Sequence, residues 1–587
     1  MNNLKKQILS VAVATSTVLS CVPVSMAAIP ADVQGTRYEE PVQILSALNI
    51  MVGDENGAYR LDDTIIRSEV AKMAIHALGL EDAAESSKGQ TMFDDVSAEH
   101  WANGYINLAV SQGIIEGDGD GNFRPNAPIS YAEAMTIMVR ATGYTVSAEE
   151  NGGYPHGYMK TGTSNGLAKN VQGSYSDKIS RGNVAYLTTN ALESKLMEQT
   201  GFGSDGKYEI TEKTLLKDKL KVTKDTGRIT AIENTSLTGS SSLAKGQIKI
   251  DNKTYETAYN MNNLLGYNVT YYVKNEGKND ESVILAMPIQ NQNNDLTISS
   301  ELFSKLTTKN GNTAIEYFKD ENTSKTNTAE ISSDATLIYN GKYQAMDKNL
   351  IDLTDKSGNI TLLDSNKNGK YDIVFVKNYE NIVVDSVSST GKIVDKYSQK
   401  VLKLDDTVDF RITKGLEEIS VSDLAEYDVL SVAASLDKEL YEVEVTNKTV
   451  EGKVTGKDSK GVLINGTKYK VAANYTDSID IGSEGVFYLD TDGKIAAFDA
   501  SKTLSSNYAY LMKAYYTKNT EKASFKLFTK DGKEVTLDAN NKIKFNGKSN
   551  VKALDVVNSL NTSEDVTASQ LVTYSTNADN KITAINT

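Results

Sequence analysis

Side chains that commonly carry out catalysis or bind transition metals are scarce in this sequence. Its 587 residues include one cysteine, three histidines and one tryptophan, and no histidine follows His156. The long remainder of the chain therefore excludes a Ser-His-Asp or Cys-His catalytic site and any metal site built on histidine or cysteine. A two-carboxylate glycosidase needs only Asp and Glu, but no tryptophan is present there to line a cleft. We expect a protein that is not an enzyme.

Long hydrophobic runs are missing after residue 28. Lys5 and Lys6 precede the apolar run ILSVAVATSTVLS, and VSMAA follows it, which predicts a signal peptide (residues 1–28) cleaved near Ala27 or Ala28. No later stretch approaches the roughly 20 apolar residues of a membrane helix, so we expect an exported protein with no transmembrane segment. Cleavage would remove the only cysteine, Cys21. The alternative is lipidation at Cys21, because VLSC resembles a lipoprotein box.

Positive charge and proline are also limited. The formal net charge is −15 at pH 7, which disfavours general binding of nucleic acids through their phosphates. Six of the seven prolines precede residue 160. Up to about residue 198 the apolar residues recur at i, i+3 and i+4, as in helices. After about residue 208 they alternate with polar residues, and Asn-Gly and Asp-Gly turns separate the runs, as in β-hairpins.

This change of period predicts a multidomain chain, with an N-terminal all-α region and a C-terminal array of small all-β modules. The second part repeats weakly: GVFYLDTDGKIAAFD and LVTYSTNADNKITAIN share a strand, a polar turn and a second strand. The predicted β modules span residues 208–290, 296–380, 381–448, 449–500 and 507–587.

A similar helix start occurs three times in the N-terminal part, in TIIRSEVAK, NAPISYAEA and KISRGNVA. Ser130 and Ser180 are placed to cap their helices, and Glu133 completes a capping box with Ser130. Ile66 stands at the cap position of the first copy and cannot accept a hydrogen bond. That helix start must therefore use another acceptor.

The residue after each cap is Arg67, Tyr131 or Arg181. Unpaired N–H groups and the macrodipole favour anions at the first turn of a helix, and a guanidinium adds a fork suited to carboxylate or phosphate. Three such starts around a pseudo-threefold axis would make an anion-binding site with several pockets. The alternative is that both arginines are solvated surface charges.

Residues 93–144 resemble an S-layer homology (SLH) repeat from start to finish. They contain an F-x-D-V opening, a His-Trp-Ala step, a G-I-I-x-G run, a D-G-x-F-x-P loop and an element similar to I-[ST]-R-A-E. Residues 32–80 resemble another copy, with Tyr38 at the tryptophan position. Residues 152–195 resemble a degenerate third copy, with Tyr158 at that position.

The resemblance implies a compact helical pseudo-trimer that binds secondary cell-wall polysaccharide, commonly through a pyruvylated sugar. In that reading the two arginines contact the ketal carboxylate, and the glycines admit the sugar close to the backbone. A core position for the tryptophan is the alternative to stacking on a sugar. The sequence departs from the pattern at Tyr131, where Arg is expected, and at Asn183, where Glu or Gln is usual, which puts one pocket in doubt. The predicted polysaccharide-binding residues are Arg67, Arg181, Tyr131, Asp95, Trp101, Gly53 and Gly117.

The segment DSNKNGKYDIVF is a candidate calcium loop. Asp364, Asn366, Asn368 and Asp372 occupy positions 1, 3, 5 and 9 of an EF-type loop, but Phe375 stands where a bidentate carboxylate is needed. An Asn-Gly turn whose side chains bind their own backbone is the favoured alternative. Calcium on other parts of the acidic surface stays open, and we expect no other cofactor.

We therefore expect an extracellular protein anchored non-covalently to secondary cell-wall polysaccharide. Two functions compete for the β modules. They assemble into an S-layer lattice by self-association, or they act as an adhesin or glycan-binding protein on the same anchor. The absence of an identifiable exposed aromatic platform favours the lattice.

Overall fold

The computed structural model describes residues 30–201, 207–239, 243–415, 417–459, 461–500, 507–517, 522–530, 532–546, 548–563, 566–576 and 581–587. The predicted signal peptide and Cys21 lie outside these residues. Within them, no helix has the length and apolar character that a membrane crossing requires. The chain divides into two compact units, residues 1–354 with 359–376 and residues 355–358 with 377–587.

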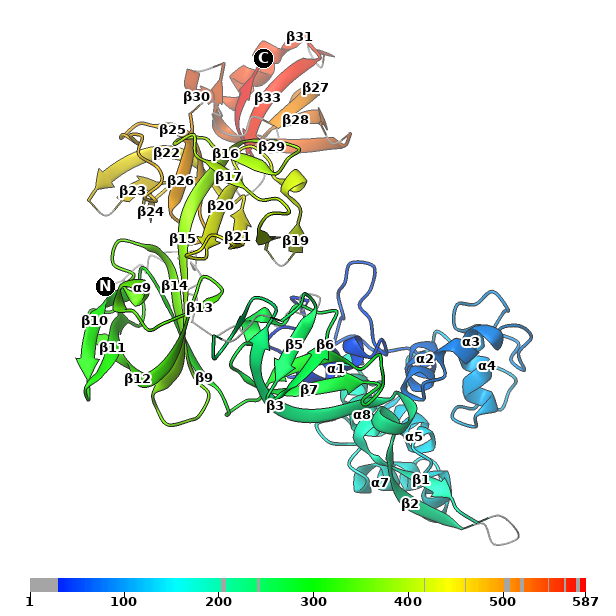
Figure 1. Ribbon diagram of the computed structural model, residues 1–587. Coiled ribbons are helices and arrows are strands. Elements are labelled where there is room, and N and C mark those ends of the chain that lie inside the picture. Colours follow the sequence, from blue (N-terminus) through cyan, green and yellow to red (C-terminus); the bar gives the residue numbers. More distant parts are fainter. Residues whose placement is uncertain are drawn as a thin grey trace, which may run out of the picture. The chain divides into compact units, whose positions relative to one another are not determined.

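Three helical repeats form the first part of the chain (Figure 1). In each repeat one helix precedes a loop and a second helix follows it, and short helices connect the repeats. This agrees with the predicted all-α region. The repeat helices are α1 (Glu39–Ala47) and α2 (Arg67–Ala77), α4 (Asn103–Ser111) and α5 (Tyr131–Ala141), and α7 (His156–Ser164) and α8 (Arg181–Glu193); the connecting helices are α3 (Glu81–Ser86) and α6 (Thr145–Glu150).

The helical repeats share a core with the β structure that follows. A hairpin of β1 (Lys195–Gln199) and β2 (Tyr208–Thr214) leads into the short π-helix η1 (Leu215–Lys219). Leu215, Leu216, Tyr272 and Leu285 belong to the same buried cluster as the side chains of the repeats. The helical region and the first β module therefore bury a common core, although the change of sequence period separates them.

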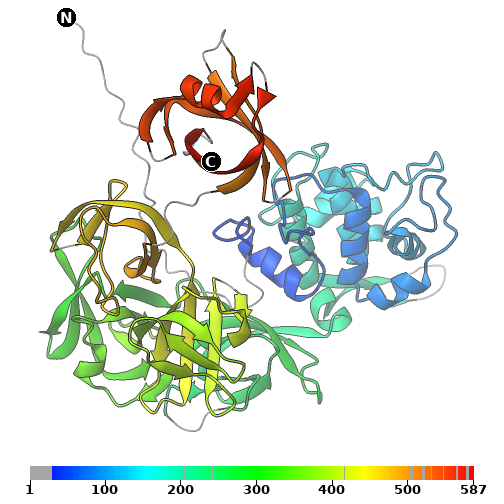
Figure 2. The same ribbon diagram turned by 90° about the horizontal axis from the view of Figure 1, so that it is seen from above.

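Five β-barrels with one strand order make up the rest of the described chain. Numbered within a barrel, strand 1 pairs with strands 2 and 4, strand 3 pairs with strands 2 and 5, and strand 4 pairs with strand 5. The contact between strands 3 and 5 is parallel in every barrel; in barrel 4 it is one isolated bridge between Val471, just after strand 3, and Ile495. This closed order, 1-2-3-5-4, is that of the OB-type Greek-key barrel. Figure 2 shows the strands of the last barrel curving around a common centre.

In barrels 2 and 3, two consecutive short strands together take one strand position, whereas each position in barrel 1 is held by a single strand. Barrel 1 consists of β3 (Val222–Ile232), β5 (Gln247–Ile250), β6 (Lys253–Glu256), β7 (Asn268–Lys274) and β8 (Ser282–Pro288), with β4 (Thr235–Ser236) and η2 (Asn262–Leu264). Barrel 2 consists of β9 (Asn294–Ser299) with β10 (Phe303–Lys309), β11 (Asn312–Phe318), β12 (Thr326–Tyr339), β14 (Ser357–Asp364) and the first part of β15 (Tyr371–Val387), with β13 (Lys342–Gln344) and α9 (Lys348–Ile351). Barrel 3 consists of the rest of β15, β16 (Lys392–Asp395), β17 (Val401–Lys403) with β18 (Asp409–Lys414), β20 (Val429–Ala434) and β21 (Leu440–Thr446), with β19 (Glu417–Ile419) and η3 (Val421–Asp423).

The last two barrels are separate in sequence. Barrel 4 consists of β22 (Thr449–Asp458), β23 (Gly461–Ile464), β24 (Thr467–Tyr469), β25 (Glu484–Leu489) and β26 (Ile495–Asp499). Barrel 5 consists of β27 (Asn507–Thr517), β28 (Lys522–Thr529), β29 (Glu534–Phe545), β33 (Gln570–Thr576) and β34 (Ile582–Asn586), with β30 (Lys548–Lys552), α10 (Ala553–Leu560), β31 (Asn561–Ser563) and β32 (Val566–Thr567).

Two predicted module boundaries differ from the strands. The first module is predicted to start at residue 208, but β2 pairs with β1 in a separate sheet and barrel 1 starts at β3. The boundary between residues 380 and 381 falls inside β15, which serves as strand 5 of barrel 2 and strand 1 of barrel 3. β15 contains neither Gly nor Pro, so its sequence offers no strong turn signal for the point where one barrel ends.

The turn between β25 and β26 buries two carboxyl groups. Asp490 is 1% exposed; its oxygens accept hydrogen bonds from the N–H of Lys494 and the side-chain amide of Asn381, both at 2.8 Å. Asp492 places Oδ2 in a buried position with no hydrogen bond, 3.5 Å from Nζ of Lys494. Burial raises the pKa of both carboxyl groups above the ordinary Asp value.

We expect mild acid to stabilise barrel 4 through these groups. Because the folded-state pKa of Asp490 is raised, its contribution to the free energy of unfolding is fully present below the unfolded-state pKa and is lost as pH rises through the folded-state value. Hydrogen-exchange protection of β25 and β26, corrected for intrinsic exchange rates, should therefore increase as pH falls from 7 toward 4. Asp490→Asn should flatten this response, and an unchanged pH response in that variant would contradict the assignment.

Candidate functional site

The three similar helix starts meet in the folded protein. Isolated β-bridges pair Thr64 with Ser180, Ile66 with Pro128, and Ser130 with Lys178. Between them, the N–H of Ile65 donates to the carbonyl of Ile179 at 3.2 Å, Ile179 donates to Ile129 at 3.1 Å, and Ile129 donates to Ile65 at 3.0 Å. These three bonds close a cycle, and the three isoleucine side chains are buried. The predicted pseudo-threefold arrangement is therefore built into the backbone.

Contacts between repeats also provide acceptors for the N–H groups in the first turn of each of these helices. In α2, the N–H groups of Arg67 and Ser68 donate to the carbonyls of Ala127 and Pro125 in the loop of repeat two, at 3.0 and 3.1 Å. The first two N–H groups of α5 and α8 donate to loop carbonyls of repeats three and one in the same way. The third N–H donates to Ser130 in α5 and to Ser180 in α8, as predicted. The expectation that unpaired amides at these helix starts attract an anion is therefore wrong, because neighbouring repeats occupy them.

Arg67 forms the contact that we call seam A, between repeats one and two. Its Nε donates to the carbonyl of Phe123 at 2.9 Å, Nη2 donates to the carbonyl of Glu116 at 3.0 Å, and Nη1 pairs with Glu133 at 2.8 Å. The arginine is buried, so it is not a solvated surface charge. Burial alone would raise the pKa of Glu133, but hydrogen bonds from Ser130 and the charge of Arg67 outweigh it and lower that pKa.

The other two seams show why the sequence departs from the repeat pattern at two positions. In seam B, between repeats three and one, Arg181 donates from Nε to the carbonyl of Tyr59 at 2.8 Å and pairs through Nη1 with Glu69 at 2.6 Å. In seam C, between repeats two and three, the positions of this ion pair hold Tyr131 and Asn183. Both members of the pair are replaced together, which avoids leaving one charge buried without its partner.

Three further predicted residues organise the loops. Asp95 accepts hydrogen bonds from the N–H groups of Phe123 and Arg124 at 2.8 and 2.6 Å, so its carboxylate holds the loop of repeat two. A Cβ on Gly53 would lie 2.6 Å from the backbone of Gly57, and one on Gly117 would meet the ring of Phe93. Both glycines are therefore required by close approaches within their own repeats, and the sugar contact stays a prediction.

Trp101 is half exposed, at 49%, and stacks on His100, so it is not a core residue. It stands two residues before α4. The equivalent positions, two residues before α1 and α7, are held by Arg37 and Tyr154. This corrects the sequence alignment, which placed Tyr38 and Tyr158 there; Tyr158 is fully buried and donates to Glu149 at 2.7 Å.

Tyr154 is the residue that sequence reasoning missed. Its side chain is 58% exposed. Burial raises the pKa of its phenol, Glu133 adds to the increase, and Ser130 and Arg67 oppose it, which places the phenol beside the ion pair of seam A. An exposed aromatic ring thus borders this seam. The sequence contains this tyrosine directly before Pro155. The third repeat is so degenerate, however, that its positions could not be matched correctly to those of repeat two.

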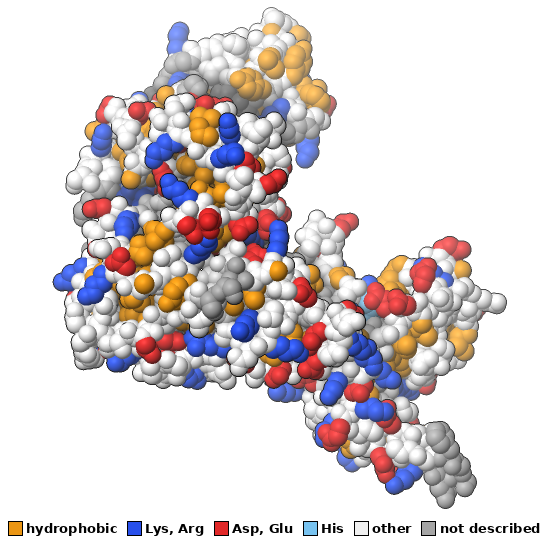
Figure 3. All heavy atoms as spheres, in the orientation of Figure 1, with side chains coloured by type: hydrophobic (Ala, Val, Ile, Leu, Met, Phe, Trp, Pro, Cys, Tyr) orange, Lys and Arg blue, Asp and Glu red, His pale blue; other side chains and the backbone are white. Residues whose placement is uncertain are grey.

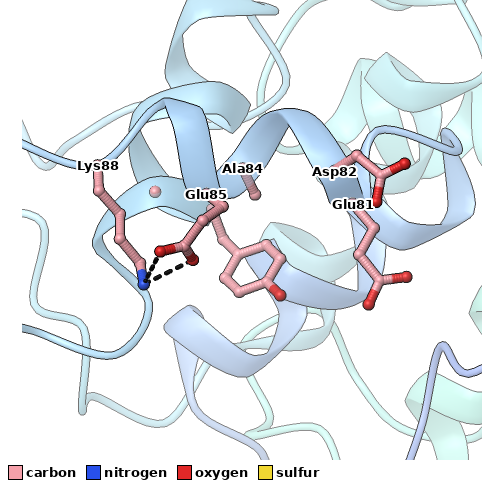
Figure 4. A pocket seen from close by; sticks show the side chains of 7 residues that line it. Glu81, Asp82, Ala84, Glu85 and Lys88 are labelled. Carbon is pink, nitrogen blue, oxygen red and sulfur yellow. Dashed lines mark hydrogen bonds and ion pairs between the residues drawn. The ribbon is translucent and has the colours of Figure 1, made fainter.

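A cavity of about 300 Å³ lies elsewhere in the helical region, beside α3 and α4. Its lining includes the carboxylates of Glu81, Asp82 and Glu85, with Lys88 bound to Glu85 (Figure 4). A site with three carboxylates and one lysine repels anions, so it does not suit a pyruvylated sugar.

The candidate calcium loop is closed by its own hydrogen bonds. Asp364 accepts from the N–H groups of Asn368 and Gly369, and the side chains of Asn366 and Asn368 accept from N–H groups two residues on. Asp372 pairs with Arg228 at 2.8 Å. A cation would have to compete with that guanidinium, and the hydrogen bonds are those of the polar turn that is the favoured alternative. In the part of the chain that the structure describes, no cluster of three or more His, Cys, Asp or Glu side chains could hold a metal ion.

Comparison with known proteins shows which family the helical repeats match. The model of the "S-layer homology domain" matches residues 31–71 and 93–135, which are the first two helical repeats. The N-terminal part of the chain therefore contains S-layer homology repeats. The third helical repeat lies outside the match, but α7 and α8 repeat the arrangement and close the cycle of seams.

Relatives match along most of the chain. It is 27% identical to the "Middle cell wall protein" of Brevibacillus brevis over 92% of its own length and 59% of that protein. It is 25% identical to the "Surface layer protein" of Brevibacillus choshinensis, over 91% and 54%. It is 26% identical to the "Cell surface protein" of Thermoanaerobacter kivui, over 100% and 71%. The chain thus spans little more than half of the first two relatives.

These names agree with a location at the cell wall surface. Enzymes also match, but over one fifth of the chain or less, in the SLH domain. The relatives that match along the β-barrels are named as wall and surface proteins.

Proposed function

We propose that this protein is a non-enzymatic surface protein whose SLH domain binds secondary cell-wall polysaccharide and whose barrels assemble into a layer. The triangular arrangement of three SLH repeats carries the proposal. It creates three seams, and Trp101 and Tyr154 provide exposed aromatic rings of the kind that stack on sugar rings. The five barrels repeat one unit and carry no catalytic constellation in the residues described.

The net charge of the SLH domain limits how it can bind an anionic wall sugar. Residues 30–193 contain 22 acidic and 11 basic side chains, so the domain as a whole repels an anionic polymer. Arg67 and Arg181 are already paired with glutamates. We propose that stacking on the exposed rings contributes most of the affinity, and that a pyruvyl carboxylate approaches the arginines only at the rims of seams A and B.

We expect Trp101→Ala and Tyr154→Ala each to weaken wall binding about tenfold, which corresponds to ~1.4 kcal/mol. Both side chains are about half exposed, so neither change should disturb folding. The measurement is co-sedimentation of the chain from residue 30 with purified sacculi, before and after mild-acid removal of ketal-linked pyruvate. Tyr208→Ala, an exposed tyrosine on β2, is the matched control and should bind normally.

The outcomes separate the parts of the proposal. Normal binding by both aromatic variants would exclude stacking on these two rings as the source of the affinity. Binding that survives acid treatment but fails in the aromatic variants would show a neutral sugar as the ligand. If the wild-type chain failed to bind sacculi, the anchoring function itself would be wrong. The adhesin alternative predicts normal anchoring with no self-assembly of the purified chain.

A further inference from the structure

Barrel 5 carries a row of exposed apolar side chains across three neighbouring strands. Tyr510 on β27 lies directly opposite Phe528 on β28 and opposite Leu571 on β33. Directly opposed residues share one face of a sheet, and all three are exposed, at 48%, 45% and 65%. Tyr508, two residues before Tyr510, lies on the same face and is 57% exposed. We call these four residues, three aromatic and one leucine, the aromatic row.

The aromatic row is unusual for the outer face of a barrel, which is normally polar. Half-exposed side chains of this size present on the order of 100 Å² each, so the row presents roughly 400 Å². The exposed large apolar residues of barrels 1 to 4 are single or in pairs rather than in a row, as with Leu436 and Ile481. Figure 3 shows hydrophobic side chains gathered on the surface of the last barrel. A contiguous patch of this kind marks a contact surface.

The charge of barrel 5 differs from that of the rest of the chain. Residues 507–587 contain eleven lysines and eight acidic residues, whereas the whole chain has a net charge of −15. The exposed residues Lys530 and Lys533 lie in the turn that follows Phe528. Two copies of barrel 5 therefore repel each other, while barrel 5 is attracted to the acidic remainder of another copy.

We infer that the aromatic row docks on a different, acidic surface of a second copy of this chain. The inference rests on the proposed layer and names one of its contacts. A contact between unlike surfaces does not close on itself in pairs, so it propagates through further copies into a ring or an open array. Its area is about half of the roughly 800 Å² that each partner buries in a stable complex. The contact should therefore be weak in solution and effective where copies are crowded on a wall.

The test uses sedimentation velocity on the chain from residue 30 over a range of protein concentrations. We expect concentration-dependent assembly of the wild type, weakened by added salt. Tyr510→Ser with Phe528→Ser should raise the concentration for half-assembly at least tenfold. Leu436→Ser with Ile481→Ser removes two equally exposed apolar side chains from barrels 3 and 4 and should change nothing.

Charge reversal tests the identity of the second surface. Lys530→Glu with Lys533→Glu should also weaken assembly; unchanged or stronger assembly would overturn the docking on an acidic surface. If the wild type assembles and the Tyr510/Phe528 variant assembles equally well, the inference fails while the layer stands. If the wild type stays monomeric, both fail. Loss of binding to wall polysaccharide in the Tyr510/Phe528 variant, with assembly unchanged, would reassign the row to a glycan.

Discussion

Arg67→Ala is expected to lower the free energy of unfolding of the SLH domain by about 3–5 kcal/mol. The substitution leaves Glu133 without its partner and two carbonyl groups, those of Phe123 and Glu116, without a donor. It also removes a cation from the face of the Phe123 ring, 5.0 Å from its centre. Breaking this ion pair is costly because the Glu133 charge stays partly desolvated, with only Ser130 as its remaining donor.

Trp101 gives a selective readout of this effect. It is the only tryptophan of the chain and lies in repeat two, so denaturant unfolding followed by its fluorescence reports the SLH domain rather than the barrels. Arg60→Ala is the matched control, because Arg60 is half exposed and pairs with Asp54 on the surface. That change should cost less than about 1 kcal/mol.

Seam C supplies a second control. Arg67→Tyr combined with Glu133→Asn copies the residues of seam C into seam A, and it should restore a substantial part of the stability that Arg67→Ala removes. A double variant as unstable as Arg67→Ala would show that the two replacements in seam C are unrelated. A loss below about 1 kcal/mol for Arg67→Ala would show that the seam is not held by this ion pair.

Tyr272→Ala is expected to destabilise the SLH domain by about 3–5 kcal/mol, although Tyr272 lies on β7 of barrel 1. The side chain is 1% exposed and belongs to the buried cluster of the helical repeats. Its removal would leave a large cavity where helices and barrel meet. The midpoint of the Trp101 fluorescence transition should therefore shift toward lower denaturant.

Tyr272→Phe is the control for this prediction. The hydroxyl of Tyr272 is buried without a hydrogen-bond partner, so its removal should be neutral or slightly stabilising. If Tyr272→Ala left the Trp101 transition unchanged, the SLH domain and barrel 1 would unfold independently. The common core would then contribute little to the stability of the helical repeats.

The local chemistry of this protein could be read from its sequence. The periodicity of apolar residues separates helices from strands because each element must turn one face to a core. The cap of Ser130 and the similar helix starts follow from short-range hydrogen bonding, which depends only on neighbouring residues. The SLH resemblance rests on the same local motifs, and the match to residues 31–71 and 93–135 confirms it.

Only the tertiary structure decided which partners these local elements meet. Sequence assigned Arg67 and Arg181 to a ligand, whereas the fold pairs them with Glu133 and Glu69 from other repeats. It also shows that Tyr131 and Asn183 replace the two members of one such pair. These contacts join residues far apart in the chain, and no local pattern specifies them.

For the barrels, too, the sequence predicted the local elements and only the tertiary structure decided how they pair. Alternating apolar residues and turns predicted strands and hairpins, but the parallel pairing of strands 3 and 5, which closes each barrel, joins strands that are not consecutive in the chain. The aromatic row was likewise hidden, because Tyr510, Phe528 and Leu571 come from separate strands and meet only through strand register. The sequence by itself determined the kinds of elements and their caps, whereas the closure of the barrels, the seams and the exposed row depend on long-range pairing.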